Sequence, residues 1–343
     1  MPIVDLFSGA GGLSIGLSAA GLRPVRAVEC MEDAATSYEI RHDFEVDRRR
    51  LESIPEAELR AWGKDVRVVV GGPPCQPWST GGLRLASQDA RDGFPAMFRA
   101  LRLIEPEAFV IENVAGLERG KARPYFLALL GSLEHLGYEV AAKTLDAADF
   151  GVPQHRRRLI IVGIRGAQFQ FPTPTHGPGR VTPWVTAGDV LTPEPVGEPN
   201  TSIVTYAKRP DVRPSPFDGL LFNGGGRPIN TSAPARTILA SAGGNKTPFI
   251  DTQNLVPAYH ATLWDRETGK LRDGHQKHVR SGSLPGGRRL TVAECATIQS
   301  FPPGFEFAGT RSVQYTLVGN AVPPKLALAV GKALALALRA SRG

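Results

Sequence analysis

The first 165 residues alternate between short apolar runs and helical stretches, and this alternation constrains the fold more than any other feature. Six runs rich in β-branched residues predict strands: "PIVDLF", "RPVRAVE", "VRVVVGG", "AFVIEN", "YEVAAKTL" and "RRLIIVGI". Helix candidates lie between them, at residues 13–20, 33–41, 95–104 and 124–136. This order predicts an α/β fold with a doubly wound, mostly parallel sheet covered on both faces. In such sheets ligands bind outside the carboxyl ends of the strands.

The middle of the chain has a different texture. From about residue 173 to 288 it is rich in Pro, Gly, Thr and Asn, as in "FNGGGRPINTSAPARTILASAGGNKTPF". Apolar runs such as "GLLF" and "TILA" favour a packed core over a disordered insertion. We therefore predict a large domain, residues 1–183 and 305–343, and a second, smaller, irregular domain, residues 184–304.

Two helix candidates close the chain, "TVAECATIQSF" and "PPKLALAVGKALALALRA". The second is amphipathic and begins with proline, and its lysines argue against a membrane span. The start, "MPIVDLFSG", has no basic segment leading into an apolar one, so we expect no secretion signal.

The net charge indicates the kind of partner to expect, and the cysteine content indicates the cellular setting. The formal charge of +7 and the pI near 9.5 favour a polyanionic partner such as nucleic acid. The three cysteines, Cys30, Cys75 and Cys295, have neither the pairing of a zinc site nor the density of a disulfide scaffold. We expect a cytoplasmic protein without a metal site.

A glycine turn follows the first predicted strand in "DLFSGAGGLSIGL". Gly9, Gly11 and Gly12 let the backbone approach a ligand and aim helix amides at it. The pattern is G-x-G-G and differs from the dinucleotide motif G-x-G-x-x-G. Glu29 ends the second strand, where an acid binds ribose hydroxyls in nucleotide-binding folds. A structural, salt-bridged or helix-capping glutamate is the alternative.

Cys75 stands at the carboxyl end of the third predicted strand, in "VVVGGPPCQPWS". The prolines stiffen this loop and the glycines admit a ligand, so the position suits a nucleophilic thiol. A buried structural thiol is the alternative.

Six motifs together carry a family resemblance: "DLFSGAGG", "GGPPCQPWS", "ENV", "QHRRRLIIVG", "RRLTVAECATIQSFP" and "GNAVPP". The chain resembles the cytosine carbon-5 DNA methyltransferases of bacterial type, from Asp5 to Pro324, with the irregular middle as a gap. The resemblance implies a Rossmann-like methyltransferase fold and S-adenosyl-L-methionine as cofactor. It also implies that the small domain recognises the target sequence.

The resemblance assigns catalytic roles to four residues. Cys75 matches the nucleophile that adds to carbon 6 of cytosine, and Glu112 the acid at ring nitrogen 3, which burial must keep protonated. Arg158 matches the arginine on the cytosine carbonyl oxygen, and Arg156 its partner near the acid. Because alternate strand residues share a face, we expect both arginines to point into the site and to favour the Cys75 thiolate.

The resemblance also implies a cofactor pocket. It places Glu29 on the ribose, and Asn320 with Ala321 folded back beside the glycine turn. Asp47 matches an acid that recognises the adenine amino group, although the usual preceding glycine is absent. The implied cofactor residues are Phe7, Gly9, Gly11, Glu29, Cys30, Met31, Asp47, Pro73, Asn320 and Ala321.

Double-stranded DNA is the implied partner, and the target base must leave the stack before a thiol can reach it. Residues 79–94 resemble the family's closing loop, with Ser79, Arg84 and Arg91 as DNA contacts. We expect a monomer associated with the nucleoid, in a restriction-modification system with a cognate endonuclease. Two alternatives are a transfer-RNA cytosine-5 methyltransferase and a non-catalytic DNA-binding regulator with the same fold.

Overall fold

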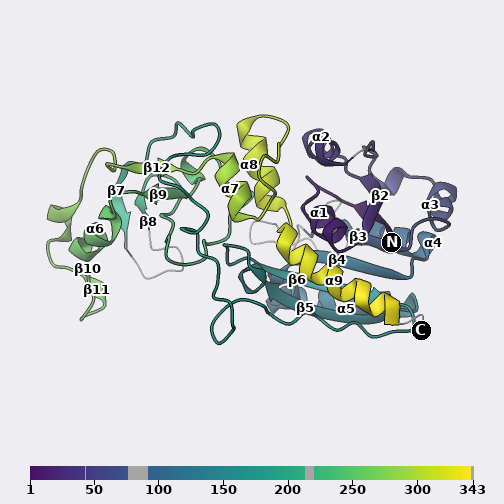
Figure 1. Ribbon diagram of the computed structural model, residues 1–343. Helices are drawn as coiled ribbons and strands as arrows, with labels where there is room; N and C mark the ends of the chain where they lie inside the picture. The colour runs from purple at the N-terminus through teal and green to yellow at the C-terminus, as the bar shows by residue number, and fades with distance from the viewer. Residues whose placement is uncertain (43, 76–91, 213–219, 341–343) are drawn as a thin grey trace.

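A six-stranded sheet forms the centre of the larger part of the protein (Figure 1). The computed structural model describes residues 1–42, 44–75, 92–212 and 220–340. The strands are β1 (Pro2–Leu6), β2 (Arg23–Val28), β3 (Val68–Gly71), β4 (Ala108–Val114), β5 (Glu139–Asp146) and β6 (Arg157–Ile164). Their order is β2-β1-β3-β4-β6-β5. The first four pair in parallel, whereas β6 is antiparallel to both β4 and β5. The prediction of an α/β fold with a mostly parallel sheet is confirmed.

Helices cover both faces of this sheet, because successive residues of each strand point to opposite sides. In β3, Val69 packs with the cluster that contains α4 residues, and Val68 and Val70 pack with the cluster that contains α1 and α9 residues. The helices of this part are α1 (Gly12–Ala19), α2 (Glu32–Arg41), α3 (Glu56–Trp62), α4 (Phe94–Ile104), α5 (Arg123–His135) and α9 (Pro324–Ala340). Helix α3 has no counterpart among the predicted elements.

The C-terminal helix returns to the start of the chain. The stretch Arg311–Ala340 meets the length and hydropathy of a membrane span, but 56% of its most apolar window is buried inside the protein. It consists of two helices, α8 (Arg311–Asn320) and α9, separated at residues 321–323. A β-carbon on Gly16 of α1 would lie 2.1 Å from the backbone oxygen of Pro324, so α1 and α9 touch closely. The apolar face of α9 is thus part of the protein core.

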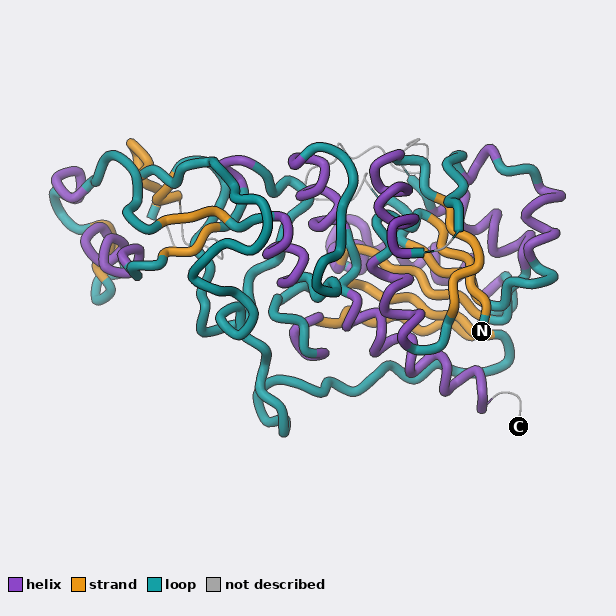
Figure 2. Tube along the Cα trace, turned by 45° about the horizontal axis from the view of Figure 1, so that its top comes forward, coloured by secondary structure: helices purple, strands orange, loops and turns teal. Residues whose placement is uncertain are grey.

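The rest of the chain forms a second, smaller part at the other end of the molecule, in which loops predominate (Figures 1 and 2). Its elements are β7 (Tyr206–Asp211), β8 (Leu220–Phe222), β9 (Phe249–Asp251), α6 (Leu255–Leu263), β10 (Trp264–Asp265), β11 (Lys270–Leu271), β12 (Gly287–Arg289) and α7 (Val292–Ile298). Short 3-10 helices in this part are η6 (Gly244–Lys246) and η7 (His275–His278). The described residues of the larger part contain four others, η1 (Leu51–Ser53), η3 (Ala115–Glu118), η4 (Gly120–Ala122) and η5 (Ala147–Phe150). An aromatic core around Tyr206, Phe249 and Tyr259 packs the smaller part. It is irregular but folded.

Candidate active site

The loop after β3 holds Cys75 in a fixed place. The side-chain amide of Asn113 donates to the backbone oxygen of Pro73 at 2.9 Å, and the Gly93 N–H donates to the oxygen of Pro74 at 2.9 Å. A β-carbon on Gly72 would lie 3.2 Å from Oε2 of Glu112, so this glycine lets the loop pass beside the acid. Cys75 itself is only 7% exposed.

Glu112 and Arg158 form an ion pair across neighbouring strands. Glu112 lies in β4 and Arg158 in β6, and Nε of the arginine donates to Oε1 of the acid at 2.8 Å. Burial raises the pKa of Glu112, although the positive charges of Arg158 and Arg156 act against that rise. The sequence predicted this direction for the acid. A carboxyl group with a raised pKa is suited to donate a proton.

The electrostatics at Cys75 differ from the expectation. Burial, and secondarily the negative charge of Asp92, raise the pKa of the Cys75 thiol to about 12. Neither arginine contributes to this shift, so the prediction that Arg156 or Arg158 favours the thiolate is wrong for this arrangement. Arg158 instead pairs with the carboxylate of Glu112, and Arg156 donates to backbone oxygens.

Asp92 is a site residue that sequence reasoning missed. It forms an antiparallel bridge with Cys75 and accepts a hydrogen bond from the hydroxyl of Tyr125. Its other carboxylate oxygen accepts the N–H of Phe94 at 3.1 Å, at the start of α4. An Asp-Gly pair before a helix is the only local signal, and such pairs are common at helix starts.

Arg156 lies near enough to the acid for its positive charge to lower the pKa of Glu112, but it makes its hydrogen bonds elsewhere. It is fully buried and donates to the backbone oxygens of Ile238 (3.0 Å), Gly319 (2.6 Å) and Ala321 (2.9 Å). Arg156 directly precedes β6, and its hydrogen bonds tie the sheet to the smaller part and to the end of α8.

The glycine turn after β1 adopts a left-handed backbone. Gly9 has a φ of 54° and Gly11 a φ of 87°, and Phe7 shares this uncommon region with a φ of 57°. A β-carbon on Gly9 would meet nothing within 4 Å, whereas one on Gly12 would lie 2.3 Å from the oxygen of Val322. The "GNAVPP" segment therefore lies against the turn, and the space in front of Gly9 is open.

Glu29 organises the neighbouring backbone. Its two carboxylate oxygens accept the N–H groups of Gly9 (2.9 Å) and Met31 (2.8 Å). A cavity of about 310 Å³ begins here and extends to Pro74, in the loop after β3. Its lining comprises Phe7, Val28, Glu29, Cys30, Arg49, Arg50, Leu51, Glu52, Pro74, Asp92 and Gly93. Residues next to Cys75 and the predicted ribose acid thus line one cavity.

Several predicted cofactor residues lie outside this lining. The carboxylate of Asp47 pairs with Arg49 at 2.6 Å, while its backbone oxygen accepts the N–H of Glu29 at 3.0 Å. Met31 is 45% exposed, and Asn320 is exposed at the end of α8. Gly9, Gly11, Pro73 and Ala321 are likewise absent from the lining, whereas Leu51 and Arg49, which were not predicted, are part of it.

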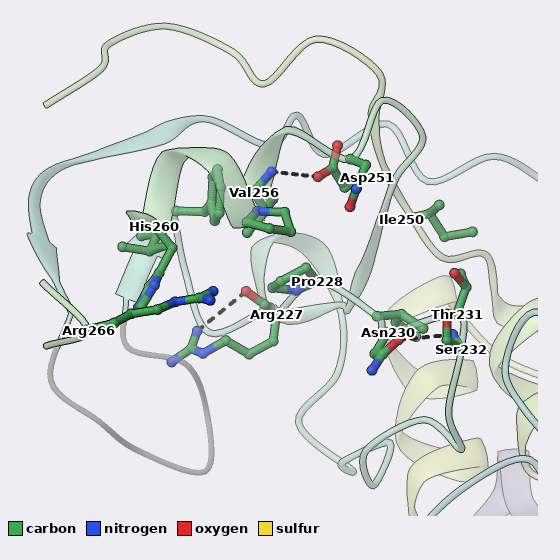
Figure 3. A pocket seen from close by; sticks show the side chains of 16 residues that line it. Arg227, Pro228, Asn230, Thr231, Ser232, Ile250, Asp251, Val256, His260 and Arg266 are labelled. Atoms are coloured by element: carbon green, nitrogen blue, oxygen red, sulfur yellow. Dashed lines mark hydrogen bonds between the residues drawn. The ribbon is translucent and has the colours of Figure 1, made fainter. Parts of the chain in front are cut away.

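The predicted DNA contacts Ser79, Arg84 and Arg91 lie outside the described residues. A second cavity, of about 450 Å³, lies in the smaller part (Figure 3). Arg227, His260 and Arg266 gather at one end of it, and Asn230 lies toward the other. We assign the chemistry to the smaller cavity, because the larger one contains none of the residues around Cys75.

Comparison with known proteins agrees with this geometry. The model of the family "C-5 cytosine-specific DNA methylase" matches residues 1–335. The Type II methyltransferase M.AplI of Arthrospira platensis is 33% identical, over 98% of this chain and 86% of that protein. The Type II methyltransferase M.MthTI of Methanothermobacter thermautotrophicus is 32% identical, over 97% of this chain and 96% of that protein.

Among solved structures, Spodoptera frugiperda DNMT2 has the same fold, with a TM-score of 0.68 and 18% identity over 98% of this chain and 99% of that one. With a family match over nearly the whole sequence and relatives above 30% identity, the chain belongs to the C-5 cytosine-specific DNA methylases.

Proposed function

We propose that this enzyme transfers the methyl group of S-adenosylmethionine to carbon 5 of a flipped-out cytosine in a short duplex DNA sequence, through a covalent bond to Cys75. The single observation that carries the proposal is the shared cavity. Glu29 lines one end of it, and Pro74 and Asp92, the neighbours of Cys75, line the other. A methyl donor and a thiol nucleophile can therefore act on one base.

The residues fit this cofactor. Gly9 leaves open space where a side chain would otherwise stand, and Glu29 offers carboxylate lone pairs to ribose hydroxyls. Phe7, Val28 and Leu51 give the cavity an apolar wall suited to a purine ring. When bound, S-adenosylmethionine supplies an electrophilic methyl group on a positively charged sulfur.

The protein residues divide the chemistry between them. Cys75 gives its proton to a water molecule, and its Sγ forms a bond to carbon 6 of the cytosine. The charge that develops on ring nitrogen 3 is neutralised by the proton of Glu112. Carbon 5, now nucleophilic, would take the methyl group that the bound cofactor supplies. A water molecule then accepts the carbon-5 proton, the carbon–Sγ bond breaks to release the thiolate, and nitrogen 3 returns its proton to Glu112.

The arginines have separate tasks in this scheme. Arg158 keeps one N–H on Glu112 and would present others to the cytosine carbonyl oxygen. Arg156 acts as a positioning residue, since its bonds run to the backbone of Ile238, Gly319 and Ala321. The loop of residues 79–94 would close over the base, and the small domain, residues 184–304, would read the sequence.

One experiment tests the proposal directly. Methyl transfer from labelled cofactor should occur to duplex DNA and not to transfer RNA, which is the runner-up substrate. Cys75→Ser should lose turnover and still bind cofactor. Full activity in Cys75→Ser would refute the covalent mechanism.

The biological setting follows from the relatives. Both curated relatives named above are Type II methyltransferases, so we propose a restriction-modification role with a cognate endonuclease. We also propose a monomer that acts on the nucleoid in the cytoplasm. Bisulfite sequencing of DNA from cells that express the protein would identify the methylated site, and that site would identify the matching endonuclease.

A further inference from the structure

Arg289, the last residue of β12, is a buried cation without a carboxylate partner among the described residues. It is 2% exposed. Its Nη1 donates to the oxygen of Thr247 at 2.8 Å, and its Nη2 donates to the backbone oxygen (3.2 Å) and Oδ1 (2.9 Å) of Asn223. Burying an unpaired charge is costly. The hydrogen bonds to Thr247 and Asn223, which belong to two separate segments, offset that cost.

The two segments are glycine-rich loops, which we name loop A (residues 223–227, "NGGGR") and loop B (residues 243–247, "GGNKT"). They pack directly on each other. The Gly226 N–H donates to the oxygen of Asn245 at 3.1 Å, and a β-carbon on Gly224 would lie 2.4 Å from that oxygen. The relative position of the loops therefore depends on close backbone contact and on Arg289, which bonds to both.

Loop B and the chain that precedes it adjoin the larger part of the protein: a β-carbon on Gly243 would lie 3.8 Å from Oγ of Ser312 in α8. The chain between loops A and B bonds to the segment before β6, through the N–H of Ala235 to the oxygen of Pro153 at 2.9 Å. Further along, a β-carbon on Gly319 would lie 2.3 Å from the oxygen of Leu239. Loop B begins four residues after Leu239, so it follows directly on a segment that packs against the end of α8.

The tips of the loops carry suitable groups for DNA. Gly224, Gly225, Gly244, Asn245 and Lys246 are exposed. Backbone amides without side chains can approach base edges closely, an asparagine amide can bind adenine, and a lysine binds phosphate. Such readout requires the donors and acceptors of the two loops to keep a fixed spacing.

We propose that Arg289 is a positioning residue for sequence discrimination: by bonding to loops A and B together, it fixes the spacing of the groups that read duplex DNA. The inference rests on the proposed sequence-specific methylation of DNA by this chain. Lysine cannot replace arginine in this role, because a single ammonium group does not present the forked donors that reach both loops.

The test compares Arg289→Lys and Arg289→Gln with wild type on two duplexes, the recognised site and the same site with one base pair changed. The measured quantity is the ratio of kcat/KM on the two duplexes. This ratio does not depend on the fraction of folded enzyme, so loss of stability alone leaves it unchanged. Arg280→Gln is the matched control, because Arg280 also stacks on an aromatic ring, that of Tyr259, but is exposed and bonds to neither loop.

We expect the ratio to fall by about ten-fold or more in both Arg289 variants, which is within the range for loss of one base-pair discrimination. The Arg280 variant should keep the wild-type ratio. A ratio within two-fold of wild type in both Arg289 variants would overturn the inference. An equal fall in Arg280→Gln would also overturn it. Failure of the proposed function is distinct, since wild type would then methylate neither duplex.

Discussion

Replacing Asp92 by Asn should lower the pKa of the Cys75 thiol. The negative charge of Asp92 is the second cause, after burial, that raises this pKa to about 12. Asparagine has the same shape and can still accept the N–H of Phe94, so the start of α4 should stay intact. The substitution therefore removes a charge while preserving the local structure.

The size of the expected pKa change follows from the β-bridge between Cys75 and Asp92. Residues opposite each other in antiparallel pairing have Cα atoms about 4.5–5.5 Å apart, which puts the two charges roughly 6 Å apart. At an effective dielectric constant of about 20 to 80 their repulsion is about 0.7–2.8 kcal/mol, or about 0.5–2 pKa units. The thiolate fraction near pH 8 should rise by about 3- to 100-fold.

The assay is the rate of iodoacetamide alkylation of Cys75 between pH 7 and 10, in a Cys30→Ser background, with the adduct located by mass spectrometry. Cys295 should not interfere, because it is fully buried and burial raises the pKa of its thiol. Glu52→Gln is the control, since Glu52 lines the same cavity but is not a cause of the Cys75 shift. An unchanged or slower rate in Asp92→Asn, or equal acceleration in Glu52→Gln, would refute the reasoning.

Four further predictions concern stability and cofactor binding. Gly12→Ala should lower the free energy of unfolding by about 1–3 kcal/mol, because its β-carbon would lie 2.3 Å from the oxygen of Val322. Gly9→Ala should cost about 1–2 kcal/mol for its left-handed backbone and should mainly weaken cofactor binding, measured by urea denaturation and calorimetric titration. Arg156→Met should cost about 3 kcal/mol or more in urea denaturation, because three backbone oxygens lose their donor, whereas exposed Arg157→Met should change stability by less than about 0.5 kcal/mol. Burial raises the pKa of Asp5 from 3.8 to about 7, so the stability that protonated Asp5 provides is complete below pH 4 and is lost as the pH rises through 7. Relative to Asp5→Asn, wild type should therefore lose about 3 kcal/mol of unfolding free energy between pH 5 and 8, and a constant difference would contradict this.

The sheet could be predicted from sequence because its signals are local. All six predicted strands exist, and β3 (Val68–Gly71) lies within the run "VRVVVGG". Helix α3 escaped prediction because its seven residues bury only Leu59 and Trp62, too short a pattern to distinguish from a loop. Helix α8 escaped because its apolar residues merge with those of the motif that follows it.

The candidate site was predictable only where one residue carries its chemistry in a recognisable motif. Cys75, Glu112 and Arg158 fall in such motifs; the structure pairs Glu112 with Arg158 and places Gly72, in the loop that leads to Cys75, beside Glu112. Asp92 and Arg289 act through partners that only the folded chain brings to them, Cys75 for the first and Asn223 with Thr247 for the second. The separation of these residues along the sequence does not predict that they are in contact.

The buried ion pair of Glu112 with Arg158 links base binding to acid strength. Burial raises the pKa of Glu112, and Arg158 is the largest opposing influence. A cytosine carbonyl that draws Arg158 toward itself weakens that opposition, so the pKa of Glu112 should rise further at the moment when ring nitrogen 3 requires a proton. Arg156 cannot make this response, because its hydrogen bonds hold backbone oxygens of three separate residues. In the proposed mechanism the two arginines, two residues apart in one motif, therefore have different tasks: Arg158 would respond to the substrate, and Arg156 would keep the surrounding segments in place.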